Sequence, residues 1–175
     1  MQCTNPLTLH NEAGTVPCGK CTACRISRAK EWSIRLMHEN YFHDNSIFVT
    51  LTYNEENMPK DGQINKREAQ NFIKRLRKHL GVDHKIRYYI TGEYGDITGR
   101  PHYHAIIFNL GLGDHNTRRS HNGFHILGGP IYKSWKNKDG TEKGFAYGGT
   151  VTPDSTRYVA EYIQKKLYGK LAIIL

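Results

Sequence analysis

Two histidines separated by one residue, His102 and His104, lie in the segment RPHYHAIIF at residues 100–108. Side chains alternate across a β-strand, so both imidazoles face the same side if this segment is a strand. Two neutral imidazoles about 6–7 Å apart along a strand can bind one divalent cation. The alternative is that both histidines only pack and hydrogen-bond on a half-buried strand, which the bare His-x-His pattern favours.

A third metal ligand is available in Glu93, near the end of an expected strand at 85–93. The turn-rich segment YGDITGRP follows, so we expect an antiparallel hairpin with the strand 102–109, bringing residue 93 close to residue 102. Two imidazoles and one carboxylate leave coordination positions open. Such a ligand set suits Mg²⁺ or Mn²⁺ bound to phosphate oxygens.

Two tyrosines four residues apart, Tyr158 and Tyr162, share one face of an expected helix at 156–168, with Lys165 and Lys166 one turn later. A tyrosine hydroxyl is a poor nucleophile at its usual pKa of about 10, and a nearby metal ion or lysine favours the phenolate. Attack on a phosphodiester would leave a covalent phosphotyrosine and a free 3′-hydroxyl, and a second tyrosine could perform a second transfer. The alternative is a tyrosine face that packs on the sheet, with the lysines in solvent.

The elements that must position these residues follow from hydrophobic patterning. Apolar residues recur at helical spacing in 22–43 and 66–80, whereas 46–53 is β-branched and aromatic and predicts a strand. We expect short strands around HILGGPIY and GFAYGGTVT, and a cap for the last helix at Asp154 or Ser155. The order of elements predicts an α+β fold with an antiparallel sheet.

The chain has 175 residues, a formal net charge of +9 and a pI near 9.4. With 11 tyrosines, this basic composition favours a nucleic-acid partner over a merely soluble basic protein. No apolar run approaches transmembrane length and the N-terminus lacks a secretory pattern, so we expect a soluble intracellular protein without a membrane partner.

The four cysteines are Cys3, Cys18, Cys21 and Cys24, and the last three lie in PCGKCTACR. Two-residue gaps suit a zinc knuckle better than a disulfide framework. An iron–sulfur cluster and reduced structural thiols are the alternatives. We expect residues 1–24 to form a cysteine-rich segment packed on a single domain at 25–175.

Three segments, in order, resemble the motifs of the HUH endonuclease superfamily: the strand FVTLTY (48–53), the His–hydrophobic–His segment (102–104) and the tyrosine helix. The stretches PCGKCTACRISRAKEWSIRL, GEYGDITGRPHYHAIIF and YVAEYIQKK look still more like replication initiation proteins of the Microviridae, small circular single-stranded DNA phages, and especially the gokushovirus branch. Each motif is weak alone, but the ordered set, from residue 3 to about 170, is specific.

The resemblance implies a rolling-circle initiator acting in the cytoplasm of the infected bacterial host. It would nick the viral strand at the origin through a 5′-phosphotyrosine and later ligate a circle. The implied fold has a central five-stranded antiparallel sheet flanked by helices. The implied partners are single-stranded DNA at the viral origin and a host replication helicase, since the sequence holds no Walker-type motor motif.

The resemblance also implies a role for each matching residue. His102, His104 and Glu93 would bind Mg²⁺ or Mn²⁺, Tyr158 and Tyr162 would be the nucleophiles, and Lys165 or Lys166 would contact the scissile phosphate or the active tyrosine. The residues expected to contact DNA, from the motifs and from the basic helix 66–80, are Thr50, Thr52, Tyr53, Arg100, Lys74, Arg75, Arg77 and Lys78.

Two other functions stay open from the sequence. One is a non-catalytic module that binds single-stranded nucleic acid, in which the tyrosines only stack on bases. The other is a single-tyrosine transposase of the same superfamily, for which Tyr158 would be dispensable.

Overall fold

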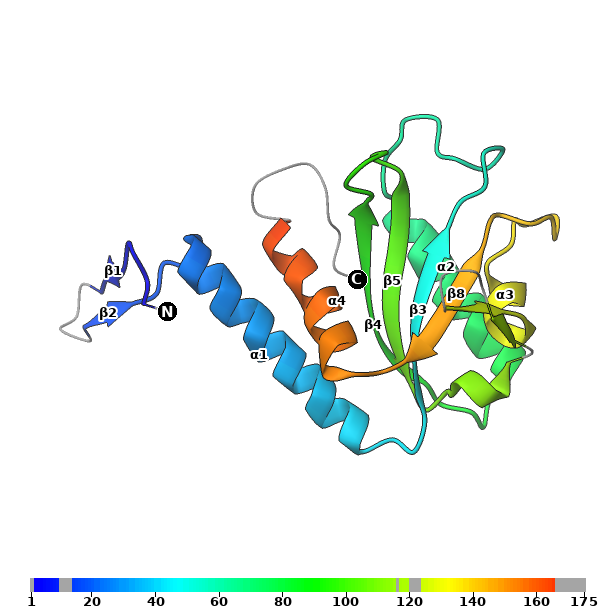
Figure 1. Cartoon of the computed structure of the whole chain (residues 1–175), viewed down its shortest axis with the longest axis horizontal. Helices are drawn as coiled ribbons and strands as arrows, with labels where there is room; N and C mark the ends of the chain where they lie inside the picture. Colours follow the sequence, from blue (N-terminus) through cyan, green and yellow to red (C-terminus); the bar gives the residue numbers. More distant parts are fainter. Residues whose placement is uncertain (1, 10–13, 116, 120–123, 166–175) are drawn as a thin grey trace.

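A computed structural model describes residues 2–9, 14–115, 117–119 and 124–165, with the backbone alone at 118, 119 and 163–165. Its main feature is an antiparallel sheet with the strand order β4-β5-β3-β8-β7-β6 (Figure 1). The strands are β3 (Ser46–Thr52), β4 (Arg87–Tyr94), β5 (Pro101–Phe108), β6 (Thr117–Arg119), β7 (His125–Leu127) and β8 (Ala146–Thr150). The expected α+β class is confirmed, and the three-residue β6 extends the five-stranded sheet at one edge.

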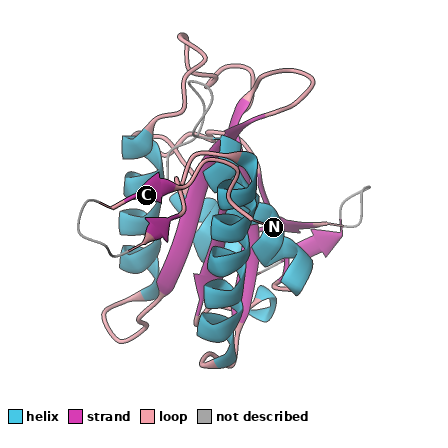
Figure 2. Cartoon of the chain, turned by 90° about the vertical axis from the view of Figure 1, so that its left-hand side faces the viewer, coloured by secondary structure: helices cyan, strands magenta, loops and turns pink. Residues whose placement is uncertain are grey.

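Helices cover both faces of the sheet (Figure 1 and Figure 2). On one face, α1 (Thr22–Tyr41) and α4 (Pro153–Lys165) enclose a core that includes Leu36, Phe48 and Val159. On the other face, α2 (Lys66–Leu80) and α3 (Gly129–Ser134) pack over a larger core, and the short 3-10 helix η1 (Leu112–Asp114) follows β5. The sheet therefore separates two helical layers, and the α1–α4 layer contains the tyrosines.

Alternation along β3 divides its side chains between the two cores. Ile47, Val49 and Leu51 belong to the core under α2, whereas Phe48 belongs to the core under α1 and α4. Thr50 follows Phe48 on the same side, because side chains two residues apart share a face of a strand. The central strand thus supports both cores while keeping polar hydroxyls toward α4.

The helix expected at 66–80 is confirmed as α2. Its N-cap is Asn65, whose side chain accepts a hydrogen bond from the Arg67 backbone N–H, and Gly81 ends it with a φ of 87°. Ala69, Phe72, Ile73 and Leu76 are buried along one stripe, as the helical spacing predicts.

The last helix begins earlier than expected, at Pro153 rather than residue 156. Thr152, not Asp154 or Ser155, precedes the first turn: its Oγ1 accepts from the Ser155 N–H at 3.1 Å, and Ser155 Oγ accepts from the Thr152 N–H at 2.8 Å. This reciprocal pair acts as a capping box, and proline is favoured at the first helical position. The described part of α4 ends at residue 165, so the expected end at 168 lies outside the described residues.

The expectation of strand structure throughout HILGGPIY was wrong. Only HIL forms a strand, β7, and the segment from Gly129 onward forms α3. Pro130 lies in the first turn of α3, where it costs no hydrogen bond, and Ile131 and Trp135 are fully buried in the core under α2. Burial of these two large side chains explains why the segment turns into a helix.

The N-terminal segment forms a small hairpin of β1 (Leu7–Thr8) and β2 (Thr15–Val16), outside the main sheet. It lies at the end of α1 that points away from the sheet (Figure 1), and Figure 2 views the molecule from this side. Within the described ranges, every helix is too short or too polar to cross a membrane.

Candidate active site

Three side chains converge on the α4 face of the β4–β5 hairpin. Glu93 pairs with His102 across the two strands, as the sequence predicts, and His104 is one alternation further along β5. The Glu93 carboxylate oxygen Oε2 lies 3.1 Å from His102 Nε2 and 3.0 Å from His104 Nε2. One ligand atom from each residue lies within 4.8 Å of the other two, so this group could hold a metal ion.

The second nitrogen of each imidazole has its own partner. His102 Nδ1 lies 3.0 Å from the Arg100 carbonyl oxygen, and His104 Nδ1 lies 2.9 Å from Thr50 Oγ1. A carbonyl can only accept, so His102 carries its proton on Nδ1 and leaves the Nε2 lone pair for a cation. Such a partner fixes the tautomer and orientation of a metal-binding histidine.

Burial also favours a cation at this position. The exposed fraction is 4% for both Glu93 and His104. A carboxylate taken out of water needs compensating charge or hydrogen bonds. A divalent ion between one carboxylate and two imidazoles would supply that charge and keep positions open for other oxygen ligands.

The tyrosines of α4 pack directly against this group. The Tyr162 ring stacks on the His104 ring, with centroids 5.6 Å apart, and the Tyr158 ring meets the same imidazole edge-on at 5.1 Å. The two phenol rings are 5.0 Å apart and nearly perpendicular. The expected shared face of the helix is therefore observed, and it faces the histidines.

The two tyrosines differ in their surroundings. Tyr158 is 43% exposed, whereas Tyr162 is 4% exposed. Burial raises the pKa of Tyr162 above its usual value, and its contacts with Tyr158 and Glu93 raise that pKa further. Tyr158 is thus the tyrosine that a bound strand can reach directly.

Helix α1 holds α4 against the sheet. Ser33 of α1 and Thr156 of α4 share a hydrogen bond of 3.1 Å between their hydroxyl oxygens, and Ala29 and Ala160 are buried small residues on these two helices. Close contact between small side chains fixes the position of α4, and hence of its tyrosine face.

The structure divides the residues expected from the first motif. Thr50 and Thr52 pair with His104 and His102 across β3 and β5, so both lie beside the candidate metal group. Tyr53 is buried on the other side, where its hydroxyl lies 3.1 Å from that of Tyr103, so its expected contact with DNA is wrong. The physical reason is alternation: Tyr53 lies two residues beyond Leu51 and joins it in the core under α2.

The remaining expected DNA contacts are dispersed. Arg100, in the turn before β5, pairs with the Glu55 carboxylate and donates to the Tyr53 carbonyl oxygen. Helix α2 covers the opposite face of the sheet, so its basic residues Lys74, Arg75, Arg77 and Lys78 do not line the tyrosine face. Arg75 instead donates to the Ser134 carbonyl oxygen of α3.

Neither lysine that follows the tyrosines can be placed at the site. Lys165 is the last residue of α4, described by its backbone alone, and Lys166 lies outside the described residues. Their role stays a prediction.

Sequence reasoning missed Phe48 and the hydrogen-bonding role of Thr50. The Phe48 ring stacks on the His104 ring at 5.6 Å and also meets the Tyr158 ring at 6.3 Å. Both residues precede Thr52 at steps of two, so alternation in FVTLTY already places them on one face. Only the register between β3 and β5 shows that this face is the one with the histidines.

The arrangement is the one implied by the resemblance to HUH proteins: a histidine pair and a carboxylate on an antiparallel sheet, with a two-tyrosine helix packed over them. The model of the replication-associated protein ORF2 family matches residues 46–167. The chain belongs to this family.

Curated relatives come from phages. The chain is 41% identical over 157 residues to the replication-associated protein VP4 of Bdellovibrio phage phiMH2K, covering 86% of this chain and 48% of the relative. It is 37% identical over 170 residues to the replication-associated protein ORF2 of Spiroplasma virus 4, covering 87% of this chain and 49% of the relative.

A third relative is the replication-associated protein ORF4 of Chlamydia phage 1, with 29% identity over 153 residues, 86% of this chain and 38% of the relative. The chain thus spans half or less of the length of these relatives. The resemblance to Microviridae replication proteins is confirmed. No solved structure matches the chain significantly.

Proposed function

We propose that this chain carries the nuclease activity of a rolling-circle replication initiator. It would cut single-stranded DNA at the viral origin through a 5′-phosphotyrosine intermediate and then transfer or ligate the strand. The packing of Tyr158 and Tyr162 on His104, beside Glu93 and His102, is the observation that carries the proposal. Relatives named as replication-associated proteins support the role in replication.

The proposed reaction conserves the number of phosphodiester bonds. A phenolic oxygen attacks the phosphorus, the bond from phosphorus to the 3′ oxygen breaks, and that oxygen takes up a proton while the phenol gives one up. Attack by a 3′-hydroxyl on the phosphotyrosine reverses the step and rejoins the strand. Because the bond energy is kept in the intermediate, ligation needs no nucleotide cofactor.

His102, His104 and Glu93 would hold the divalent ion, with Mg²⁺ or Mn²⁺ as the proposed identity. A bound ion supplies charge that polarises a phosphate oxygen and favours an ionised phenol. The chain's own contribution is positioning: α1 and the sheet fix α4, and Thr50 and the Arg100 carbonyl orient the imidazoles.

The two tyrosines suit successive transfers. Tyr158 is exposed and would make the first attack, whereas Tyr162, buried beneath it, would act after the first tyrosine has been loaded. A host replication helicase and single-stranded origin DNA are the proposed partners, and the cytoplasm of the infected bacterium is the proposed location.

A covalent-adduct assay tests this function. End-labelled single-stranded fragments of the parent phage genome are incubated with the protein and Mn²⁺ or EDTA, then run on a denaturing protein gel. We expect a labelled band with Mn²⁺ that is lost with EDTA and in Tyr158→Phe/Tyr162→Phe, and kept in the control Tyr41→Phe, whose tyrosine is exposed on α1. A retained gel shift without any covalent band would favour the non-catalytic binding module.

A further inference from the structure

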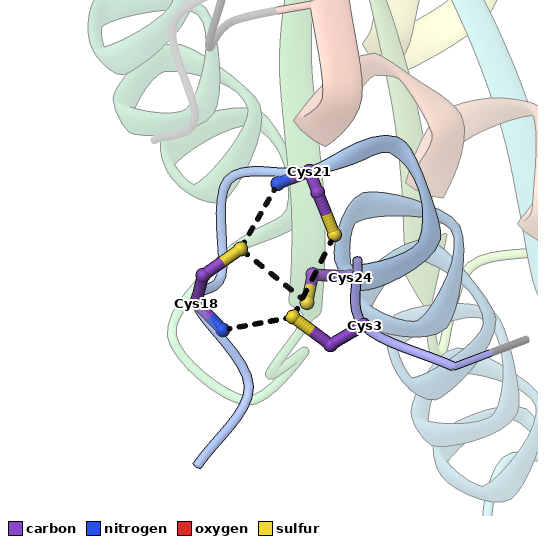
Figure 3. A group of neighbouring side chains, drawn as sticks. All are labelled: Cys3, Cys18, Cys21 and Cys24. Carbon is purple, nitrogen blue, oxygen red and sulfur yellow. Dashed lines mark hydrogen bonds between the residues drawn. The ribbon is translucent and has the colours of Figure 1, made fainter. Parts of the chain in front are cut away.

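All four cysteines of the chain gather at the start of α1, away from the candidate active site (Figure 3). Cys3 comes from the segment before β1, Cys18 follows β2, Cys21 is the N-cap of α1 and Cys24 lies in its first turn. Their sulfur atoms point toward one another, and all four lie within 4.8 Å of each other. The cluster thus joins two separate segments of the chain.

The spacing of the sulfurs matches that around a single ion. Cys18 Sγ lies 3.9 Å from Cys24 Sγ, and Cys21 Sγ lies 3.8 Å from Cys3 Sγ. Four sulfurs bound at about 2.3 Å to one tetrahedral zinc ion lie roughly 3.8 Å apart. The cysteines are free, at separations far beyond those of a disulfide bond.

Backbone groups around the sulfurs favour thiolates. The Cys18 N–H points to Cys3 Sγ at 3.3 Å, and the N–H groups of Lys20 and Cys21 point to Cys18 Sγ at 3.5 and 3.3 Å. Gly19, with a φ of 72°, allows the tight turn that directs these N–H groups. The first turn of α1, TACR, has no acidic residue, so the thiolates provide the negative charge that a helix N-terminus favours.

The two alternatives for the cysteine cluster, reduced structural thiols and an iron–sulfur cluster, fit less well. Thiols that only fill a core would be buried, yet Cys3, Cys18 and Cys21 are half-buried and only Cys24 is buried. A four-iron cluster binds each thiolate to a different iron atom, so its sulfurs lie farther apart than around one ion. The compact group therefore favours a mononuclear site.

We propose that Cys3, Cys18, Cys21 and Cys24 bind one Zn²⁺ in a closed, structural tetrathiolate site. Four protein ligands leave no position for a substrate, which is typical of structural rather than catalytic zinc. The ion would tie the segment before β1 to the first turn of α1 and so hold the β1–β2 hairpin in place. This site is independent of the proposed nuclease chemistry, because it shares no residue with the His102–His104 group.

Metal analysis of purified variants tests the proposal separately from catalysis. We expect one zinc per chain in the unmodified protein, in the control Ser27→Ala, whose side chain is exposed on α1, and in His102→Ala/His104→Ala. We expect loss of zinc in Cys18→Ser and Cys24→Ser. Zinc absent from the unmodified protein, or iron with its visible absorption in place of zinc, would overturn the proposal.

Amide hydrogen exchange on the unmodified protein covers the case in which the cysteine variants fail to fold. Removal of zinc by a thiol-modifying reagent with a chelator should speed exchange in residues 2–9 and 14–25, and leave β3 and β5 protected. Unchanged exchange in the N-terminal segment after complete metal loss would contradict a structural role.

Discussion

The imidazole of His104 lies almost parallel to the phenol ring of Tyr162, with the centroids 5.6 Å apart and an angle of 10° between the ring planes. His104 also reaches Glu93 through Nε2 and Thr50 through Nδ1. One buried histidine therefore connects the tyrosine helix to the carboxylate and to the central strand. The candidate nucleophiles and the metal-competent group belong to one packed unit, whose geometry the sheet determines.

The difference in exposure between the tyrosines predicts their order of action. Tyr158→Phe should reduce the rate of the first adduct by roughly three orders of magnitude or more, because the exposed nucleophile is removed. Tyr162→Phe should still form the first adduct but fail in the second transfer. Quenched-flow adduct formation and a circle-ligation assay measure the two steps, and the opposite pattern in the two variants would refute this order.

Glu93 should be needed for metal binding. Glu93→Gln keeps the shape of the side chain but removes the negative charge that compensates a divalent cation, so Mn²⁺ affinity should fall by at least about tenfold. Glu161→Gln, on the exposed side of α4, is the matched control. Titration followed by the electron paramagnetic resonance of free Mn²⁺ gives the affinities; equal affinities in both variants would remove Glu93 from the ligand set.

Thr50 should act as a positioning residue through His104. Thr50→Val is nearly isosteric but lacks the hydroxyl that contacts Nδ1 at 2.9 Å, so metal affinity should fall by about 10–100-fold. Thr50→Ser retains the hydroxyl and should restore most of the affinity. If valine and serine behave alike in the Mn²⁺ titration, the hydrogen bond has no part in orienting the imidazole.

Buried tyrosines predict loss of stability at alkaline pH. Burial raises the pKa of Tyr89 above its ordinary value of about 10. Above that pH the unfolded chain therefore loses this proton first, and the free energy of unfolding falls as pH rises. Because the Tyr89 hydroxyl finds no hydrogen-bond partner among the described residues, Tyr89→Phe should also stabilise the protein at neutral pH by about 1 kcal/mol.

Urea unfolding at neutral pH and at several values above the ordinary tyrosine pKa measures both effects. The matched control is Tyr88→Phe, because Tyr88 is half-buried on the neighbouring position of β4. A steeper alkaline decline in Tyr89→Phe than in the unmodified protein would contradict the assignment.

Local pattern was enough to predict α2, β3 and the β4–β5 hairpin, and the hairpin brought Glu93 to His102 as expected. What sequence alone could not supply was register and layer. The pairing of Thr50 with His104 depends on how β3 aligns with β5, and the placement of α2 on the far face depends on the path of the chain after β3.

Tyr53 is a different case, because its placement could have been inferred from the sequence. Its position in the motif FVTLTY favoured a contact with DNA, yet alternation puts it on the face of Leu51 and opposite to Thr52. The Tyr53 ring packs against Trp135 in the core under α2. Strand alternation was therefore a better guide to this side chain than membership of the motif.

The most direct test of the proposed nucleophiles is mass spectrometry of the covalent adduct. After nuclease and trypsin digestion, cleavage following Arg157 and Lys165 releases the peptide YVAEYIQK, which contains both α4 tyrosines. We expect this peptide to carry a nucleotide through a 5′-phosphate, on Tyr158 in the first cleavage. An adduct located on another peptide, with YVAEYIQK unmodified, would contradict the assignment of the α4 tyrosines as nucleophiles.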